Sequence, residues 1–224
     1  MLNVAIRYQP ILAELRRLQP EMVLEVGSGP EGLALFWRRP VVGTDIQFKR
    51  RPLKHIQPVV ASSLALPFAD RAWPVVVSCD MLEHVPPPLR AAAVAELARV
   101  CDRALVLAFP SGGAATVGYD TLAAQFRRAG RPLPGWLSEH LRYGLPDAES
   151  VAALLHGAGW SVRTSWHEPV ADHVVLMWWE SRRPVQAATY GLMRLAGPWL
   201  APCLPSDGRG TPLRALLVAA RAGG

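Results

Sequence analysis

Short apolar runs along this chain alternate with stretches in which apolar residues recur every three or four positions. Short runs bounded by glycine, proline or polar residues are typical of buried parallel strands, and the wider spacing is typical of amphipathic helices. The pattern predicts strands at residues 22–26, 41–44, 58–61, 75–78, 104–109, 160–165 and 172–179. It predicts helices at 8–18, 31–39, 89–100 and 148–158, the last with Asp147 as its N-cap.

Strands and helices that alternate in this way favour an α/β fold with a doubly wound, mostly parallel sheet. Residues 119–143 fit the alternation poorly, and we interpret 119–146 as a lid or substrate-binding insertion over the active-site edge. Residues 184–224 mix apolar stretches with glycine and proline, which predicts an appended helical tail. The tail is too interrupted for a membrane-spanning helix, so docking onto the domain, dimerisation and peripheral membrane contact stay open, in that order.

Composition narrows the class of protein. Half of the residues are apolar and 19% are charged, as in an ordinary globular protein. The net charge is +6, but the arginines are scattered over separate elements, so we expect a solvated basic surface rather than a nucleic-acid partner. The three cysteines are widely spaced and form no CxxC pair, so we expect no disulfide framework and no metal site. We see no signal peptide and expect a cytoplasmic location.

A glycine-rich turn is the strongest chemical signal. Gly27, Ser28 and Gly29 directly follow the first predicted strand, where glycine lets a ligand approach the backbone closely. Asp45 ends the second strand, and a carboxylate there can accept hydrogen bonds from the ribose of an adenosine-containing cofactor. NAD and S-adenosylmethionine (SAM) proteins share this pattern. Glu25 favours SAM, because an acid near the turn suits a cationic amino-acid end and not a pyrophosphate.

At this point the sequence resembles the class I SAM-dependent methyltransferases, in their small-molecule "type 11" branch. The resemblance is carried in order by residues 23–29, 42–46, 65–73, 77–85 and 139–160. It implies a Rossmann-like, seven-stranded sheet with an antiparallel last strand, in a methyltransferase domain over residues 1–183. It also implies SAM as the cofactor and a small-molecule methyl acceptor.

Carried over by position, the resemblance assigns a cofactor role to twelve residues. Those around the methionine part would be Glu25, Gly27, Ser28 and Gly29, and those at the ribose and adenine would be Asp45, Ile46, Ser62, Ser63 and Leu64. Cys79, Asp80 and Met81 would lie beneath the sulfonium. Ser62 departs from the family pattern, which has an acid at this position, and serine is a weaker acceptor for the adenine amino group.

Three residues are candidates for catalysis. His84 follows the fourth strand, and His140 and Tyr143 lie in the predicted lid. Methyl transfer to a well-placed nucleophile does not always need a protein base, but a hydroxyl acceptor would benefit from one. Each of the three also has a structural interpretation, as a side chain that only packs or caps. Two alternatives to a methyltransferase remain, a non-catalytic SAM-binding protein and an NAD-dependent oxidoreductase.

Overall fold

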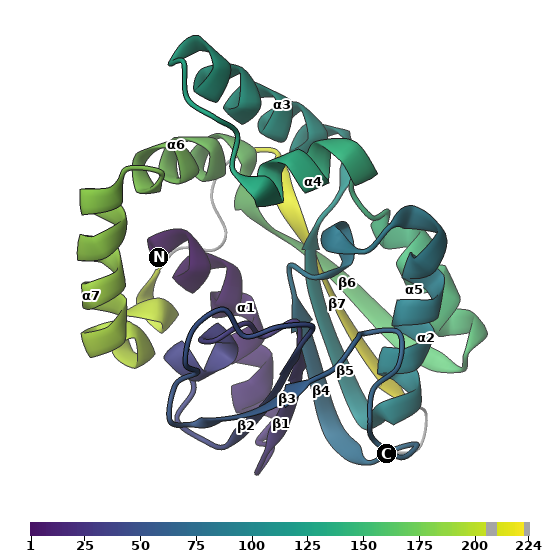
Figure 1. Cartoon of the computed structure of the whole chain (residues 1–224). Coiled ribbons are helices and arrows are strands. Elements are labelled where there is room, and N and C mark those ends of the chain that lie inside the picture. The colour runs from purple at the N-terminus through teal and green to yellow at the C-terminus, as the bar shows by residue number, and fades with distance from the viewer. Residues whose placement is uncertain (205–209, 222–224) are drawn as a thin grey trace.

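The computed structural model describes residues 1–204 and 210–221. It contains a seven-stranded sheet in the order β3-β2-β1-β4-β5-β7-β6 (Figure 1). The first five strands are parallel, and β7 is antiparallel to both of its neighbours. The strands are β1 (Val23–Val26), β2 (Val41–Asp45), β3 (Ile56–Val60), β4 (Trp73–Cys79), β5 (Cys101–Pro110), β6 (Trp160–Pro169) and β7 (Pro212–Arg221). The predicted fold class is confirmed.

Helices cover both faces of the sheet and the edge at which its parallel strands end (Figure 1). They are α1 (Leu2–Leu18), α2 (Arg90–Val100), α3 (Gly112–Arg128), α4 (Gly135–Tyr143), α5 (Ala148–Gly157), α6 (Val170–Glu180) and α7 (Arg183–Leu200). Short 3₁₀ turns are η1 (Gly32–Leu35), η2 (Leu82–His84), η3 (Pro87–Leu89) and η4 (Ala201–Cys203). Asp147 caps α5 as predicted, because its carboxylate accepts a hydrogen bond from the Ser150 backbone N–H at 2.8 Å.

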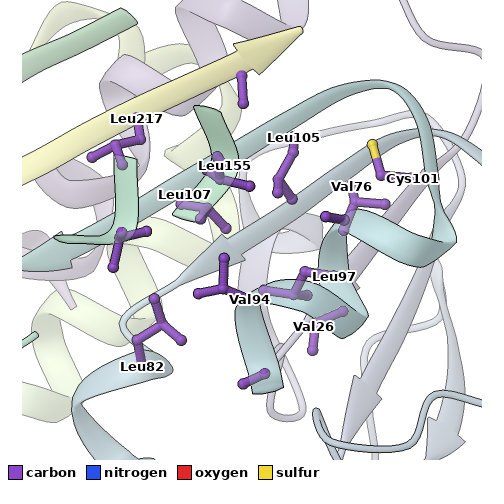
Figure 2. Close-up of a cluster of buried hydrophobic side chains, with 14 of the residues drawn as sticks. Val26, Val76, Leu82, Val94, Leu97, Cys101, Leu105, Leu107, Leu155 and Leu217 are labelled. Atoms are coloured by element: carbon purple, nitrogen blue, oxygen red, sulfur yellow. The ribbon is translucent and has the colours of Figure 1, made fainter. Parts of the chain in front are cut away.

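Two hydrophobic cores hold these layers together. On one face, α2 and α5 pack against the central strands through residues such as Leu97, Leu155 and Leu107 (Figure 2). On the other face, Ile11 and Leu15 of α1 pack against Val77 and its neighbours. A third cluster joins α3, α4 and α6 at the carboxyl ends of the parallel strands. This third cluster forms a wall above the edge where ligands bind in open α/β sheets.

The structure corrects two predicted elements. Residues 172–179 are not a strand but part of α6, and the strand that completes the sheet is β7. The helix predicted at 31–39 is only the 3₁₀ turn η1. The predicted insertion 119–146 contains most of α3 and all of α4.

The helical tail predicted at 184–224 is helical only in part: its described residues contain α7, η4 and β7, and residues 205–209 and 222–224 lie outside the described residues. Helix α7 docks onto the domain, where a Cβ at Gly197 would lie 3.2 Å from the carbonyl oxygen of Leu35, and Met193 is buried. The same helix exposes Leu192, Leu195 and Trp199, so dimerisation and peripheral membrane contact stay predictions. Within residues 1–204 and 210–221, no helix has both the length and the apolar character needed to cross a bilayer.

Candidate functional site

Two cavities lie over the carboxyl ends of the parallel strands. The first has a volume of about 790 Å³, within the range of small-molecule pockets. Nine residues assigned to the cofactor from the sequence line it: Gly27, Gly29, Asp45, Ile46, Ser62, Ser63, Leu64, Asp80 and Met81. The structure therefore brings together, from the ends of β1, β2, β3 and β4, most of the predicted cofactor set.

The glycine turn after β1 supplies the floor of this first cavity. The backbone N–H groups of Gly27 and Ser28 both donate to the carbonyl oxygen of Thr44, at 2.8 and 3.0 Å, which ties the turn to the end of β2. Gly27 has a φ of +82°, and a Cβ there would lie 2.7 Å from Cγ of Met81. A side chain at this position would both strain the backbone and push into the cavity wall, so glycine is required.

Asp45 links the two turns that border the first cavity. Its Oδ2 accepts a hydrogen bond from the backbone N–H of Gly29 at 2.9 Å, and its Oδ1 accepts one from Gln47 at 3.3 Å. The side chain is only partly buried and lines the cavity, so it retains acceptor capacity towards a ligand. A carboxylate can accept about four hydrogen bonds, and two of these are used within the protein.

Two apolar side chains on the wall of the first cavity are exposed to solvent. Ile46 is 69% exposed and Leu64 is 38% exposed, although both line the first cavity. The hydroxyl of Ser62 accepts a hydrogen bond from the backbone N–H of Leu64 at 3.1 Å. A flat heterocycle between these side chains would remove their apolar surface from water, which fits the adenine of an adenosine cofactor.

Three residues of the predicted cofactor set do not line the first cavity. Glu25 is fully buried, and its carboxylate accepts hydrogen bonds from the Tyr8 hydroxyl at 2.6 Å and from the Leu33 backbone N–H at 2.8 Å. Burial raises the pKa of Glu25 to about 7. Ser28 and Cys79 are also buried. Glu25 therefore links η1 to α1 inside the protein. It does not reach the first cavity, where its predicted contact with the amino-acid end of the cofactor would have to form.

The second cavity has a volume of about 530 Å³ and opens beside the first. Asp80, His84 and Trp136 line both cavities, so the two spaces share a wall. Its other sides come from α1, α3, α4 and α6, and they include the aromatic side chains of Tyr119 and Phe126. The predicted lid thus contributes its helices to this second space.

A network of charged side chains holds Asp80 at the shared wall. Asp80 has a φ of +53°, and its two carboxylate oxygens accept hydrogen bonds from Arg7 at 2.5 Å and from Arg214 at 2.8 Å. Arg214 also faces Glu168 at 3.3 Å, and Glu168 pairs with His173 at 2.7 Å. Burial alone would raise the pKa of Glu168, but the neighbouring Arg214 and His173 hold it at about 2. Each charged side chain of this network therefore has a partner of opposite charge.

His84 and His140, two of the predicted catalytic residues, meet at the second cavity. Nδ1 of His84 lies 2.6 Å from a carboxylate oxygen of Glu139, and its Nε2 lies 3.4 Å from Nε2 of His140. Burial, together with the nearby His84, lowers the pKa of His140 to about 3, so His140 is neutral at pH 7. Burial and the neighbouring Asp80 carboxylate raise the pKa of Glu83 to about 8.

Tyr143, the third predicted catalytic residue, does not line either cavity. Its ring lies under the guanidinium of Arg142, and its backbone carbonyl accepts a hydrogen bond from Arg90. Tyr143 ends α4, where the chain turns at Gly144 with a φ of +65°. The structural interpretation of this residue therefore fits better than the catalytic one.

Several residues at the site were missed from the sequence. Arg7 lies on α1, before the first residue of the predicted helix, and Arg214 lies on the unpredicted strand β7. A signal for Arg214 was available, because it is the one charged residue within the apolar run 212–220 and a buried charge requires a partner. Nothing in the sequence indicated that its partners would be Asp80 and Glu168.

Comparison with known proteins supports the resemblance found in the motifs. Residues 24–109 match a family model described as a methyltransferase domain, the type 11 model, and the resemblance is confirmed over this span. This span runs from β1 to β5 and contains the glycine turn, Asp45 and Asp80. A search of curated proteins returns no match.

Solved structures with the same fold include methyltransferases. The magnesium protoporphyrin IX methyltransferase of Synechocystis PCC 6803, with bound S-adenosylhomocysteine, is 15% identical with a TM-score of 0.57, and the match covers 99% of this chain and 84% of that one. Phosphoethanolamine N-methyltransferase 2 of Haemonchus contortus, in complex with SAM, is 13% identical with a TM-score of 0.57, covering 96% of this chain and 52% of that one. At this identity the likeness shows the fold.

Proposed function

We propose that the protein transfers a methyl group from SAM to a small-molecule acceptor, because its residues 24–109 match the methyltransferase-domain family. One observation carries this proposal: a cavity lined by the glycine turn and by Asp45 shares the wall formed by Asp80, His84 and Trp136 with a second cavity. A donor and an acceptor in these cavities would meet at that wall. The crystallisation of related folds with SAM or S-adenosylhomocysteine supports the choice of cofactor.

The first cavity fits SAM by its hydrogen-bond acceptors and its shape. Asp45 would accept hydrogen bonds from the ribose hydroxyls, and Ile46 and Leu64 would cover the adenine. Gly27 and Gly29 leave room for the backbone to lie against the ligand. When bound, SAM supplies an electrophilic methyl group on a sulfonium. The carboxylate of Asp80, held by Arg7 and Arg214, lies at the shared wall, where it would face the sulfonium end of the cofactor.

The second cavity has the chemistry to hold a small organic acceptor. Tyr119, Phe126 and Trp136 present aromatic surface, and Arg7 and His84 present polar groups. Holding the nucleophile at the shared wall would supply much of the rate, because orientation converts an encounter into an intramolecular step. The pair of His84 and Glu139 is the candidate for accepting a proton from the acceptor.

The two alternatives have less support. A scaffold that only binds SAM has no need of a second cavity behind the shared wall. A dinucleotide needs a helix N-terminus at the glycine turn for its pyrophosphate, and here the turn leads into the four-residue 3₁₀ segment η1. Glu25 does not distinguish SAM from NAD, because this acid is buried away from the first cavity.

Calorimetric titration tests the proposal. S-adenosylhomocysteine and SAM should bind with one site per chain, and NADH should not bind. A panel of small hydroxyl and amine compounds should then be screened for acceptor-dependent release of S-adenosylhomocysteine. Binding of NADH without binding of SAM or S-adenosylhomocysteine would overturn the proposal in favour of an oxidoreductase. Binding of SAM with no turnover across the whole panel would favour the scaffold.

A further inference from the structure

Three side chains with metal-binding atoms converge on the wall of the second cavity. Glu83 and His84 lie on η2, and His140 lies on α4, more than fifty residues later in the chain. One carboxylate oxygen and two imidazole nitrogens from these residues lie within 4.8 Å of one another. All three residues line the second cavity, and His84 lines the first as well. No metal site was expected from the sequence, because the fold alone brings the second histidine to the Glu-His pair.

Glu83 is the observation that points to a ligand. Its side chain is 0% exposed, and no other described residue donates a hydrogen bond to either carboxylate oxygen. The closest cationic or imidazole group is Nε2 of His140, 3.9 Å away. Arg7 and Arg214 lie nearby but donate to Asp80, and Arg90 donates to backbone carbonyls instead. A buried carboxyl group normally has a hydrogen-bond partner or coordinates a metal ion, and the oxygens of Glu83 have neither from another described residue of this structure.

The two histidines are arranged as metal ligands are. Their Nε2 atoms lie 3.4 Å apart. Two nitrogens at about 2.1 Å from one ion, with a tetrahedral angle between them, are also separated by about 3.4 Å. Nδ1 of His84 is held by the carboxylate of Glu139 at 2.6 Å. That contact places the proton on Nδ1 and leaves the Nε2 lone pair for an ion, as in the carboxylate–histidine–metal arrangement of known sites.

We propose that Glu83, His84 and His140 bind one divalent transition-metal ion at the wall of the second cavity. Two imidazoles and one carboxylate are the ligand set of Zn²⁺ and of neighbouring first-row ions, and they leave coordination positions open for another molecule. Binding would draw the Glu83 carboxylate inward by roughly an ångström, since ligand atoms on one ion lie at most about 4.2 Å apart. Glu139 is the positioning residue for His84.

The metal site also indicates which class of acceptor would be methylated. This part of the proposal rests on the proposed function. An ion with open positions facing the second cavity would bind an oxygen of the acceptor, and it would lower the pKa of a hydroxyl or phenol bound to it. With its Nε2 on the ion, His84 would be a ligand and not the base, so the hydroxyl proton would leave to solvent. An oxygen lone pair would form the new bond to the methyl carbon, and the carbon–sulfur electron pair would stay on sulfur. The acceptor class is therefore an alcohol or phenol, methylated on oxygen.

Metal binding is tested on the full chain without SAM. Calorimetric titration with Zn²⁺, and visible spectroscopy with Co²⁺, should show one bound ion per chain. His84→Gln and His140→Gln should each weaken the affinity at least about tenfold, and Glu139→Gln should weaken it about 10- to 100-fold although it is not a ligand. His55→Gln, an exposed histidine outside the cluster, is the matched control and should bind as the wild type does.

Two further measurements keep the outcome interpretable. His84 is partly exposed, so His84→Gln should fold, and thermal unfolding of each variant checks this. S-adenosylhomocysteine binding is measured on the same samples. If folded wild type and folded His84→Gln bind Zn²⁺ with equal affinity, the metal site is refuted, whatever the cofactor result. If metal binds as expected while S-adenosylhomocysteine does not, the metal site stands and the proposed function fails.

Discussion

Replacement of Asp45 tests the cofactor pocket at one side chain. Its carboxylate accepts hydrogen bonds from the backbone of Gly29 and Gln47, and it lines the first cavity, where it would also hold the ribose. Asp45→Ala removes both functions. Asp45→Asn keeps an oxygen that can accept from the Gly29 N–H, and it removes the negative charge.

The expected loss follows from the contacts. A hydrogen bond to a charged group contributes roughly 1.5–3 kcal/mol, and each 1.4 kcal/mol corresponds to tenfold in affinity. Asp45→Ala should therefore raise the dissociation constant for S-adenosylhomocysteine by about tenfold or more. Asp45→Asn should have an intermediate effect, because it retains the tie between the two turns. The fold should persist, since the residue is only partly buried.

Calorimetric titration of S-adenosylhomocysteine measures these constants, and circular dichroism checks the fold of each variant. Asp120→Ala removes an exposed acid on α3 that lines neither cavity, and its dissociation constant should equal that of the wild type. An unchanged dissociation constant in folded Asp45→Ala would mean that the ribose lies elsewhere, and the assignment of the first cavity would be wrong.

Three further predictions address the glycine turn, the buried charges and Glu25. Gly27→Ala should weaken S-adenosylhomocysteine binding about tenfold or more in calorimetry, because the strain of a left-handed alanine, about 1–2 kcal/mol, and its contact with Met81 would displace the turn and Met81 at the cavity wall; equal binding would contradict the close approach. Arg214→Met should lower the free energy of unfolding, measured in urea, by about 3–5 kcal/mol, since it leaves two buried carboxylates without this partner, whereas exposed Arg163→Met should cost at most about 1 kcal/mol. Similar losses in both arginine variants would refute the buried network. Because burial raises the pKa of Glu25 from 4.5 to about 7, the folded state holds a proton that the unfolded state releases, and wild-type stability should fall relative to Glu25→Gln as the pH rises from about 4.5 to about 7. A stability difference that does not change between pH 5 and pH 8 would rule this out.

Parallel strands of the sheet could be predicted from the sequence, because the local pattern of apolar residues determines them. The parallel strands β1, β2, β4 and β5 are short, rich in valine and leucine, and bounded by glycine, proline or polar residues. Buried strands have this composition because both of their faces are covered. The glycine turn and Asp45 were predictable for the same reason, since backbone geometry and strand ends determine their positions.

The late elements could not be predicted because tertiary packing decides them. Residues 170–180 are rich in valine and tryptophan, which favours a strand, but they form α6 and pack against α3. Residues 212–221 are rich in alanine and leucine, which favours a helix, yet they form β7 between β5 and β6. A short apolar run cannot be assigned to a strand or a helix by periodicity alone.

The residues of the candidate site also divide into those placed by strand ends and those placed by tertiary packing. Gly27, Asp45 and Asp80 follow strands directly, so their places at the sheet edge follow from topology. The orientation of Glu25 does not, because its partner Tyr8 comes from α1. The meeting of His84 and His140 also depends on how α4 packs, and it is this contact that adds a proposed metal site to the predicted cofactor pocket.

A crystal structure of the full chain with S-adenosylhomocysteine tests the central claim most directly. We predict ribose hydroxyls within hydrogen-bond distance of Asp45, adenine against Ile46, and the sulfur atom facing the wall of Asp80 and His84, open to the second cavity. A ligand bound elsewhere, or a sulfur atom sealed off from the second cavity, would contradict the account.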